Sequence, residues 1–188
     1  DGVDQDCDGQ VDDATSCEAT TDCAYREEAP PGPSAPRIAY LICATVSGAA
    51  PRTWTAAEEF CSAVGGLGSG YTLAMPFDAN KAGGLSNQVA SVAGVLPAEL
   101  FWLGAADSDG DGSWDWLLPA GPPPATTALT FDNWESLPEQ PDLSGEACMA
   151  GQWSGNLSGP YSSADLPWYD EACSSPTHQY ICEASAAP

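Results

Sequence analysis

Eight cysteines constrain the fold of this 188-residue chain more than any other feature of its sequence. Their number is even and no two of them form a Cys-x-x-Cys pair. His178 is the only histidine. A disulfide framework therefore fits the pattern better than a zinc site. Since disulfides persist in oxidising compartments, the sequence predicts a secreted or cell-surface protein.

The length of the chain suits one ordinary domain with an appendage. No apolar run approaches the ~20 residues that a membrane helix needs, so we expect no membrane insertion. The sequence starts at Asp1, with neither a methionine nor a signal sequence. We therefore expect it to be a processed or excised piece of a larger secreted protein.

The charge balance is strongly acidic, with 27 aspartates and glutamates against 4 lysines and arginines. Such a field repels phosphates, which argues against nucleic acid and anionic membrane surfaces as partners. Cations are the natural counterparts. The alternative is that the acidity only keeps a secreted protein soluble or reflects a salty habitat.

Three parts follow one another along the chain. Residues 1–28 carry ten acids and one base and have few large apolar side chains, so they need metal or disulfides to fold. Residues 29–36 are rich in proline and predict a semi-rigid linker. The globular domain is expected over residues 37–188.

Local patterns within the domain predict two helices and several short strands. Thr53 is a suitable N-cap for a helix that ends at Gly65-Gly66. A second helix is expected over residues 80–93, although Gly83-Gly84 weakens it. One face of the first helix is formed by Trp54, Ala57, Cys61 and Val64, and one face of the second is formed by Leu85, Val89 and Val92. Strands are expected at residues 38–44, 101–105, 114–117, 148–153 and 179–183.

A set of motifs occurs in a fixed order in the last third of the chain. They are Trp134, Gln140-Pro141-Asp142, Glu146, Cys148, Trp168, Asp170, Cys173 and Cys182-Glu183, preceded by Trp54, Cys61 and Trp102-Leu103-Gly104. Over roughly residues 38–184 the chain resembles a C-type lectin-like domain. The resemblance implies an α+β fold with two helices, short antiparallel sheets and a long loop region, stapled by disulfides. Many members bind calcium and, through it, a sugar.

The resemblance also implies a disulfide connectivity, which spacing alone leaves open because four cysteines allow three pairings. The implied pairs are Cys61 with Cys182 and Cys148 with Cys173, with Cys23 and Cys43 as the extra bridge of the long form of the family. Cys7 and Cys17 remain, and we expect them to close the acidic segment on itself.

The resemblance places the first of three candidate calcium sites in the long loop. The implied calcium ligands are Gln140, Asp142, Glu146 and Asp170, and Tyr169 joins them in the implied ligand-binding set. Calcium takes six to eight oxygens, and a cis peptide at Pro141 would turn the side chains on either side of it toward one point. Two departures stand out: Tyr169 occupies the position of an Asn ligand, and the motif needs a two-residue shift between Trp134 and Cys148. The alternative is a solvated loop whose carboxylates only repel one another.

The second candidate uses Asp107 and Asp111 in the stretch Asp-Ser-Asp-Gly-Asp-Gly. These positions align with an auxiliary calcium of some family members, which shares the glutamate equivalent to Glu146. Ala147 replaces the aspartate that usually completes that site. An acidic turn before Trp114 is the alternative.

The third candidate lies in the N-terminal segment, where Asp4, Asp6, Asp8 and Asp12 alternate around Gly9 in the manner of a calcium loop. Thr15 stands where an EF-hand has its glutamate. The stretch is similar to Asp-Cys-Asp-Gly repeats of bacterial surface proteins, for which metal binding is expected. The alternative is a disordered acidic tail.

The functional expectation is a secreted calcium-binding module that recognises carbohydrate. In the family, the order Gln-Pro-Asp accompanies galactose-type sugars. The competing interpretation is an adhesion module that binds a cell-surface protein and uses calcium only structurally. An enzyme is not expected, because nothing organises a catalytic arrangement around His178. The identity of the sugar or protein partner and the oligomeric state stay open.

Overall fold

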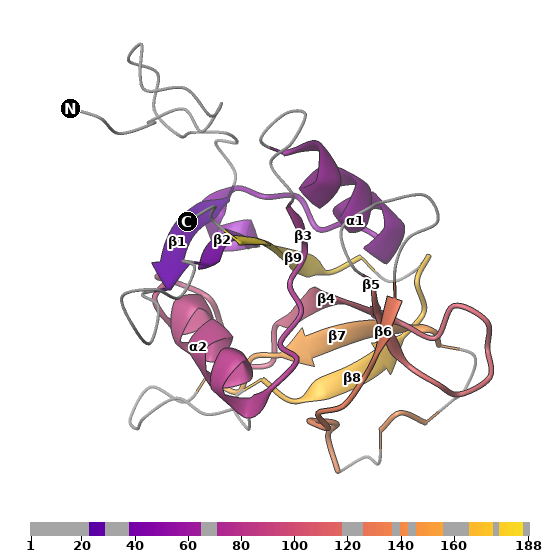
Figure 1. Cartoon of the computed structure of the whole chain (residues 1–188). Helices are drawn as coiled ribbons and strands as arrows, with labels where there is room; N and C mark the ends of the chain where they lie inside the picture. The colour runs from indigo at the N-terminus through magenta and orange to yellow at the C-terminus, as the bar shows by residue number, and fades with distance from the viewer. Residues whose placement is uncertain are drawn as a thin grey trace.

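A mixed sheet with one helix on each of its faces forms the fold of the chain (Figure 1). The computed structural model describes residues 23–28, 38–64, 71–117, 126–136, 140–142, 146–155, 166–174 and 177–185. Four features expected from the sequence lie outside the described residues. They are the calcium loop at Asp4, Asp6, Asp8 and Asp12, the Cys7–Cys17 pair, the linker at 29–36 and the Gly65-Gly66 helix end.

The elements alternate between short strands and two α-helices. In chain order they are β1 (Ala24–Glu28), β2 (Ile38–Cys43), the 3-10 turn η1 (Thr45–Ser47), α1 (Trp54–Ala63), β3 (Thr72–Leu73), α2 (Ala79–Ala90), β4 (Leu100–Ala106), β5 (Asp115–Leu117), β6 (Thr126–Ala128), β7 (Cys148–Gln152), β8 (Trp168–Glu171) and β9 (Gln179–Ser185). The sheet order is β1-β2-β9-β4-β5-β6, while β3 pairs with β9 and β7 joins β4 to β8. Only the β4–β9 pair among these is parallel. The two helices, the strands and the C-type lectin-like fold expected from the sequence are confirmed.

Both helices start where the sequence places a capping side chain. The hydroxyl of Thr53 accepts from the backbone N–H of Ala56, and the carboxylate of Asp78 accepts from that of Lys81 at 2.8 Å. Each bond satisfies one of the N–H groups that a helix start leaves without a partner. In the middle of α2, Gly84 lies directly against the carboxylate of Glu28, so a side chain at this position would displace that carboxylate.

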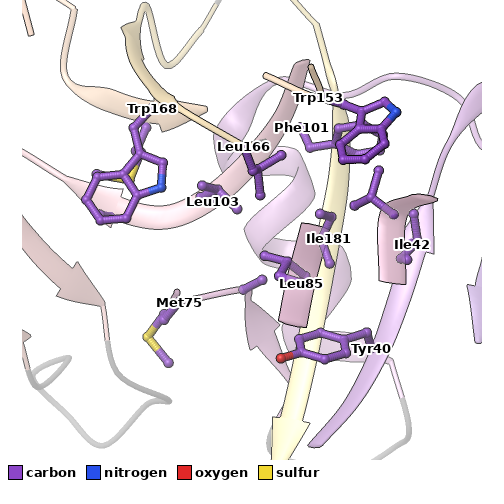
Figure 2. Packing of buried hydrophobic residues seen from close by; sticks show 14 of the residues in the cluster. Tyr40, Ile42, Met75, Leu85, Phe101, Leu103, Trp153, Leu166, Trp168 and Ile181 are labelled. Carbon is purple, nitrogen blue, oxygen red and sulfur yellow. The ribbon is translucent and has the colours of Figure 1, made fainter. Parts of the chain in front are cut away.

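Strand β4 separates two apolar clusters, because its side chains alternate between the faces of the sheet. Phe101 and Leu103 face the cluster that Leu85 of α2 completes, which Figure 2 shows together with Trp168 and Ile181. Trp102 faces the opposite cluster, to which α1 contributes Trp54, Ala57 and Cys61. The apolar faces predicted for both helices are therefore buried on opposite sides of one sheet.

Strand β1 pairs along its whole length with β2, from Ala24 opposite Ile42 to Glu28 opposite Ile38. From the sequence, residues 24–28 were assigned to the acidic segment, because that segment has few large apolar side chains. Their inward face carries charge that finds partners on other elements. Arg26 donates to Ser91 Oγ at 2.7 Å, and Glu28 accepts from the Tyr40 hydroxyl at 3.1 Å.

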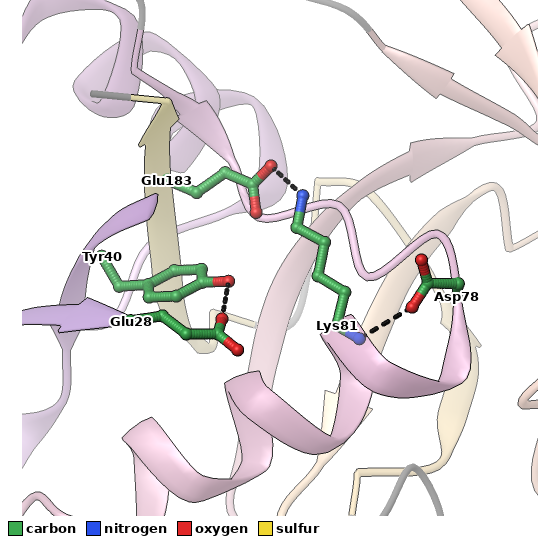
Figure 3. Close-up of polar contacts among 5 residues, drawn as sticks. All are labelled: Glu28, Tyr40, Asp78, Lys81 and Glu183. Atoms are coloured by element: carbon green, nitrogen blue, oxygen red, sulfur yellow. Dashed lines mark hydrogen bonds and ion pairs between the residues drawn. The ribbon is translucent and has the colours of Figure 1, made fainter. Parts of the chain in front are cut away.

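A buried ion pair lies beside this contact and joins α2 to β9 (Figure 3). Lys81 Nζ lies 2.6 Å from Glu183 Oε1, and the two side chains are only 9% and 8% exposed. Burial raises the pKa of Glu183, whereas Lys81 opposes that rise. A buried charge without its partner is costly, so the pair fixes α2 against the terminal strand.

Three disulfides join the described parts of the chain. They link Cys23 with Cys43, Cys61 with Cys182, and Cys148 with Cys173, as the resemblance implied. No cysteine is free among the residues that the structure describes. The Cys61–Cys182 bridge ties α1 to β9, and the Cys148–Cys173 bridge ties β7 to the end of β8.

Candidate functional site

Three carboxylates from separate segments converge in the long-loop region. Asp142 follows Pro141, Glu146 precedes β7, and Asp170 lies on β8. One carboxylate oxygen of each lies within 4.8 Å of one oxygen of each of the others. Asp170 is buried, with 3% of its surface exposed, while Asp142 is exposed. The structure thus brings together three of the four calcium ligands that the resemblance implied.

Gln140 joins this group through the backbone of β8. Its side-chain oxygen accepts from the N–H of Asp170 at 3.3 Å, and the N–H of Asp142 donates to Asp170 Oδ1 at 3.1 Å. The Gln140-Pro141 peptide is cis, as the resemblance implied. The residues on both sides of Pro141 therefore engage the same aspartate.

Strand pairing holds the carboxylates of the group in place. Asp170 lies opposite Met149 of β7, and β7 in turn pairs with β4. Two backbone hydrogen bonds fix the loop that carries Gln140. The N–H of Gln140 donates to the carbonyl of Glu135 at 3.0 Å, and the N–H of Glu135 donates to the carbonyl of Trp168. The acids are thus built on paired strands and a loop bonded to them.

The group makes its surroundings electrostatically negative. Burial raises the pKa of Glu171, and the carboxylates of Glu146 and Asp170 raise it further. Carboxylates that lie close together repel one another, so the cluster is stabilised either when one of them takes up a proton or when it binds a cation. A hard cation with oxygen preference fits this donor set.

Tyr169 does not share the position of the carboxylates. Neighbouring side chains of a strand point to opposite faces, so Tyr169 leaves β8 on the other side from Asp170. Its hydroxyl lies 3.2 Å from Gln152 Oε1 and 3.4 Å from Glu135 Oε2. Burial raises the pKa of this hydroxyl, and Glu135 raises it further. Sequence reasoning missed Glu135 and Gln152, because no motif marks either of them.

The second acidic group forms a turn closed by its own carboxylate. Asp107 is buried, and its Oδ1 accepts from Gly110 at 2.8 Å and from Asp111 at 3.2 Å, while its Oδ2 accepts from Gly112 at 3.0 Å. Gly110 and Gly112 have positive φ angles of 73° and 84°, which glycine adopts without strain. An acidic turn without a cation accounts for these bonds.

Oxygens of Asp107, Asp109 and Asp111 nevertheless lie within 4.8 Å of one another. Asp109 was not predicted, although the alternation of aspartates pointed to it. Glu146, expected to be shared with this group, lies in the group with Asp142 and Asp170, and its sharing stays a prediction. The N–H of Ser113 donates to Asp111 at 2.7 Å, which lowers the pKa of that carboxyl.

Comparison with known proteins identifies the class to which this arrangement belongs. The family model for the lectin C-type domain matches residues 50–184, which is more than half of the chain. The chain therefore belongs to the C-type lectin domain family. No curated protein matches it. No enzyme family is indicated, and no helix among the described residues is long and apolar enough to cross a membrane.

Solved structures of carbohydrate-binding lectins share the fold at low sequence identity. The C-type lectin CEL-I from Cucumaria echinata is similar with a TM-score of 0.58 and 16% identity, over 86% of this chain and 96% of that one. The cow C-type carbohydrate-recognition domain of CD23, solved in the presence of a GlcNAc2Man3 oligosaccharide, is similar with a TM-score of 0.53 and 18% identity, over 87% of this chain and 100% of that one. At these identities the likeness establishes the fold.

Proposed function

We propose that this chain is a secreted module that binds calcium through Gln140, Asp142, Glu146 and Asp170 and recognises a galactose-type sugar at that site. The observation that carries the proposal is the convergence of three carboxylates from three segments, one of them buried. Membership of the C-type lectin family and the likeness to carbohydrate-binding lectins support the same function.

The chemistry of the group suits calcium. Calcium takes six to eight oxygen ligands and tolerates irregular geometry. Three carboxylates and the Gln140 amide supply oxygens from one side, and the sugar and water would supply others. Tyr169 stands where the family has an amide ligand, and its side chain leaves β8 on the other side from Asp170, so the site has one protein oxygen fewer. We therefore place its affinity at the weak end, with a Kd of about 10⁻⁴ to 10⁻³ M.

The choice of sugar rests on the order of the residues around Pro141. An amide both donates and accepts hydrogen bonds, whereas a carboxylate only accepts. Gln140 and Asp142 therefore offer an unlike pair of partners to two neighbouring hydroxyls of a sugar. In the family this order accompanies galactose-type sugars, so galactose is the first ligand to test.

The second candidate function is a protein-binding adhesion module in which calcium only orders the long loop. The arrangement of Tyr169 favours it, because the hydroxyl is already engaged with Glu135 and Gln152. An aromatic ring held in this way is also a common contact residue in protein interfaces.

Retention on immobilised galactose tests the proposal. We expect the chain to be retained in millimolar calcium, to be released by a chelator, and not to be retained on immobilised mannose. Asp142→Asn removes one charge but keeps the N–H that donates to Asp170, and it should abolish retention. Glu59→Gln removes an exposed charge on α1 and should leave retention unchanged. If calcium raises the melting temperature but no sugar column retains the chain, the protein-binding function is the better one.

A further inference from the structure

A recess lies beside the β5–β6 pair and has a different chemistry from the carboxylate site. It is a groove of about 450 Å³, whose walls include Ser113, Trp114, Leu129, Phe131, Asp132 and Trp134. This volume lies in the range of small-molecule pockets. The groove walls contain none of Gln140, Asp142, Glu146 and Asp170, so a ligand here would be separate from the proposed calcium site.

Each aromatic ring in the walls of the groove packs against another ring. The rings of Trp114 and Trp134 meet edge to face with centroids 4.8 Å apart. Both Phe131 and Trp134 also pack edge to face on Trp168 of β8, at 5.4 Å and 5.8 Å. Phe131 and Trp134 are only half-buried, so part of each ring faces outward. A preformed aromatic recess binds a ligand with little ordering cost.

One carboxylate is fixed beside these rings. Asp132 is exposed, and its Oδ1 accepts from the backbone N–H of Trp134 at 3.1 Å. Aromatic faces together with a carboxylate attract an organic cation, through the ring quadrupole and through charge. Calcium suits the groove poorly, since a hard cation needs many oxygen ligands that aromatic rings do not supply.

The charge distribution of the chain supports the same occupant. The formal net charge is −23, and none of the described residues that line the groove is basic. The lysine and arginines that the structure describes have partners elsewhere: Arg26 with Ser91, Arg52 with Phe60, and Lys81 with Glu183. A ligand cation is therefore complementary to the groove.

We propose that this groove binds a small alkylammonium cation, with its alkyl groups against Trp114, Phe131 and Trp134 and its charge beside Asp132. Such a cation is weakly hydrated, so it loses little solvation on meeting an aromatic wall. A neutral ligand of the same shape gains the apolar contact but neither the cation–π attraction nor the attraction of the carboxylate. The site is independent of calcium and of sugar binding.

The test is a titration of the ¹⁵N-labelled full chain with choline, followed by the NMR signals of the tryptophan indole groups. A chelator is present throughout and the ionic strength is constant, so that calcium and screening do not contribute. The control ligand is 3,3-dimethylbutan-1-ol, which has the shape of choline without its charge. We expect saturable shifts of the Trp114 and Trp134 indole signals, with the neutral ligand binding about tenfold more weakly, as cation–π pairing predicts.

Two variants locate the charge effect. Asp132→Asn keeps an oxygen to accept from the N–H of Trp134 and removes only the charge, so it should weaken choline binding about three- to tenfold. Glu59→Gln removes a charge from α1 and should leave the affinity unchanged. Equal binding of choline and its neutral counterpart by the wild-type chain would overturn the proposal, as would unchanged affinity in Asp132→Asn. Stronger shifts of the same signals by methyl β-galactoside would overturn it in favour of a sugar subsite.

Discussion

Removing one charge from the carboxylate group should stabilise the chain without calcium and weaken its response to calcium. Asp142→Asn is the suitable change, because Asp142 is exposed and its N–H bond to Asp170 does not involve the side chain that is altered. Without a cation the three carboxylates repel one another. With a cation the same charges provide the binding energy.

The magnitude follows from the separation of the carboxylate oxygens, which is at most 4.8 Å. Two unit charges at that distance repel by about 1 kcal/mol in water and by about 3 to 4 kcal/mol at an effective dielectric constant of about 20. The exposure of Asp142 favours the lower value, so relief from two neighbours amounts to about 1 to 2 kcal/mol. In a chain of this size that raises the melting temperature by about 2 to 8 °C.

Calcium should stabilise the wild type more than it stabilises the variant. At about 10 mM calcium and a Kd of about 10⁻⁴ to 10⁻³ M, binding stabilises the wild type by about 1.4 to 2.7 kcal/mol. We expect the variant to keep less than half of this gain. The assay is thermal unfolding in chelator and in calcium at fixed ionic strength, with Glu59→Gln as the control. A variant that melts lower than wild type in chelator and gains as much from calcium would refute the reasoning.

Three further predictions concern other parts of the chain. Burial lowers the pKa of His178, so the folded state resists protonation of this side chain. The free energy of unfolding should therefore fall as the pH drops below about 6.5. Chemical denaturation at pH 7 and pH 5 should show a smaller loss of stability in His178→Gln than in the wild type. Non-reducing peptide mapping should find Cys7 joined to Cys17, and free thiols at these positions would contradict the expected staple of the acidic segment. Tyr169→Asn should lower the stability in chelator by about 1 kcal/mol, because Glu135 and Gln152 lose the hydroxyl that they contact. The calcium affinity should stay unchanged, because the side chain at position 169 leaves β8 on the other side from Asp170; tighter calcium binding would show that residue 169 is a ligand position.

The sequence predicted the parts of the fold that strong local signals mark. Thr53 and the apolar face from Trp54 to Cys61 placed α1, and continuous apolar runs placed β4 and β9. Strands β3, β6 and β8 were not predicted, and each has only two to four residues, which are too few to show a period. The three residues of β5 are equally few, and only the run from Trp114 to Leu117 indicated that strand. Strand β1 was hidden because its inward face carries Arg26 and Glu28, whose partners lie far along the chain.

The candidate site was predictable where a motif fixes the order of residues and not where only tertiary contact joins them. Asp142, Glu146 and Asp170 were named from their places beside Pro141, Cys148 and Trp168, and the structure brings them together. Glu135 and Gln152 stand in no motif, and they meet the Tyr169 hydroxyl only after β7 and β8 have paired. Their positions depend on the packing of the loop, which the sequence order alone does not specify.

A crystal structure grown with calcium and methyl β-galactoside tests the central claim most directly. We predict an ion bound by Asp142, Glu146 and Asp170 with oxygens at about 2.3 to 2.6 Å, and two sugar hydroxyls in its coordination shell. Crystals that show no ion among these three carboxylates, or a galactoside bound away from them, would contradict the account.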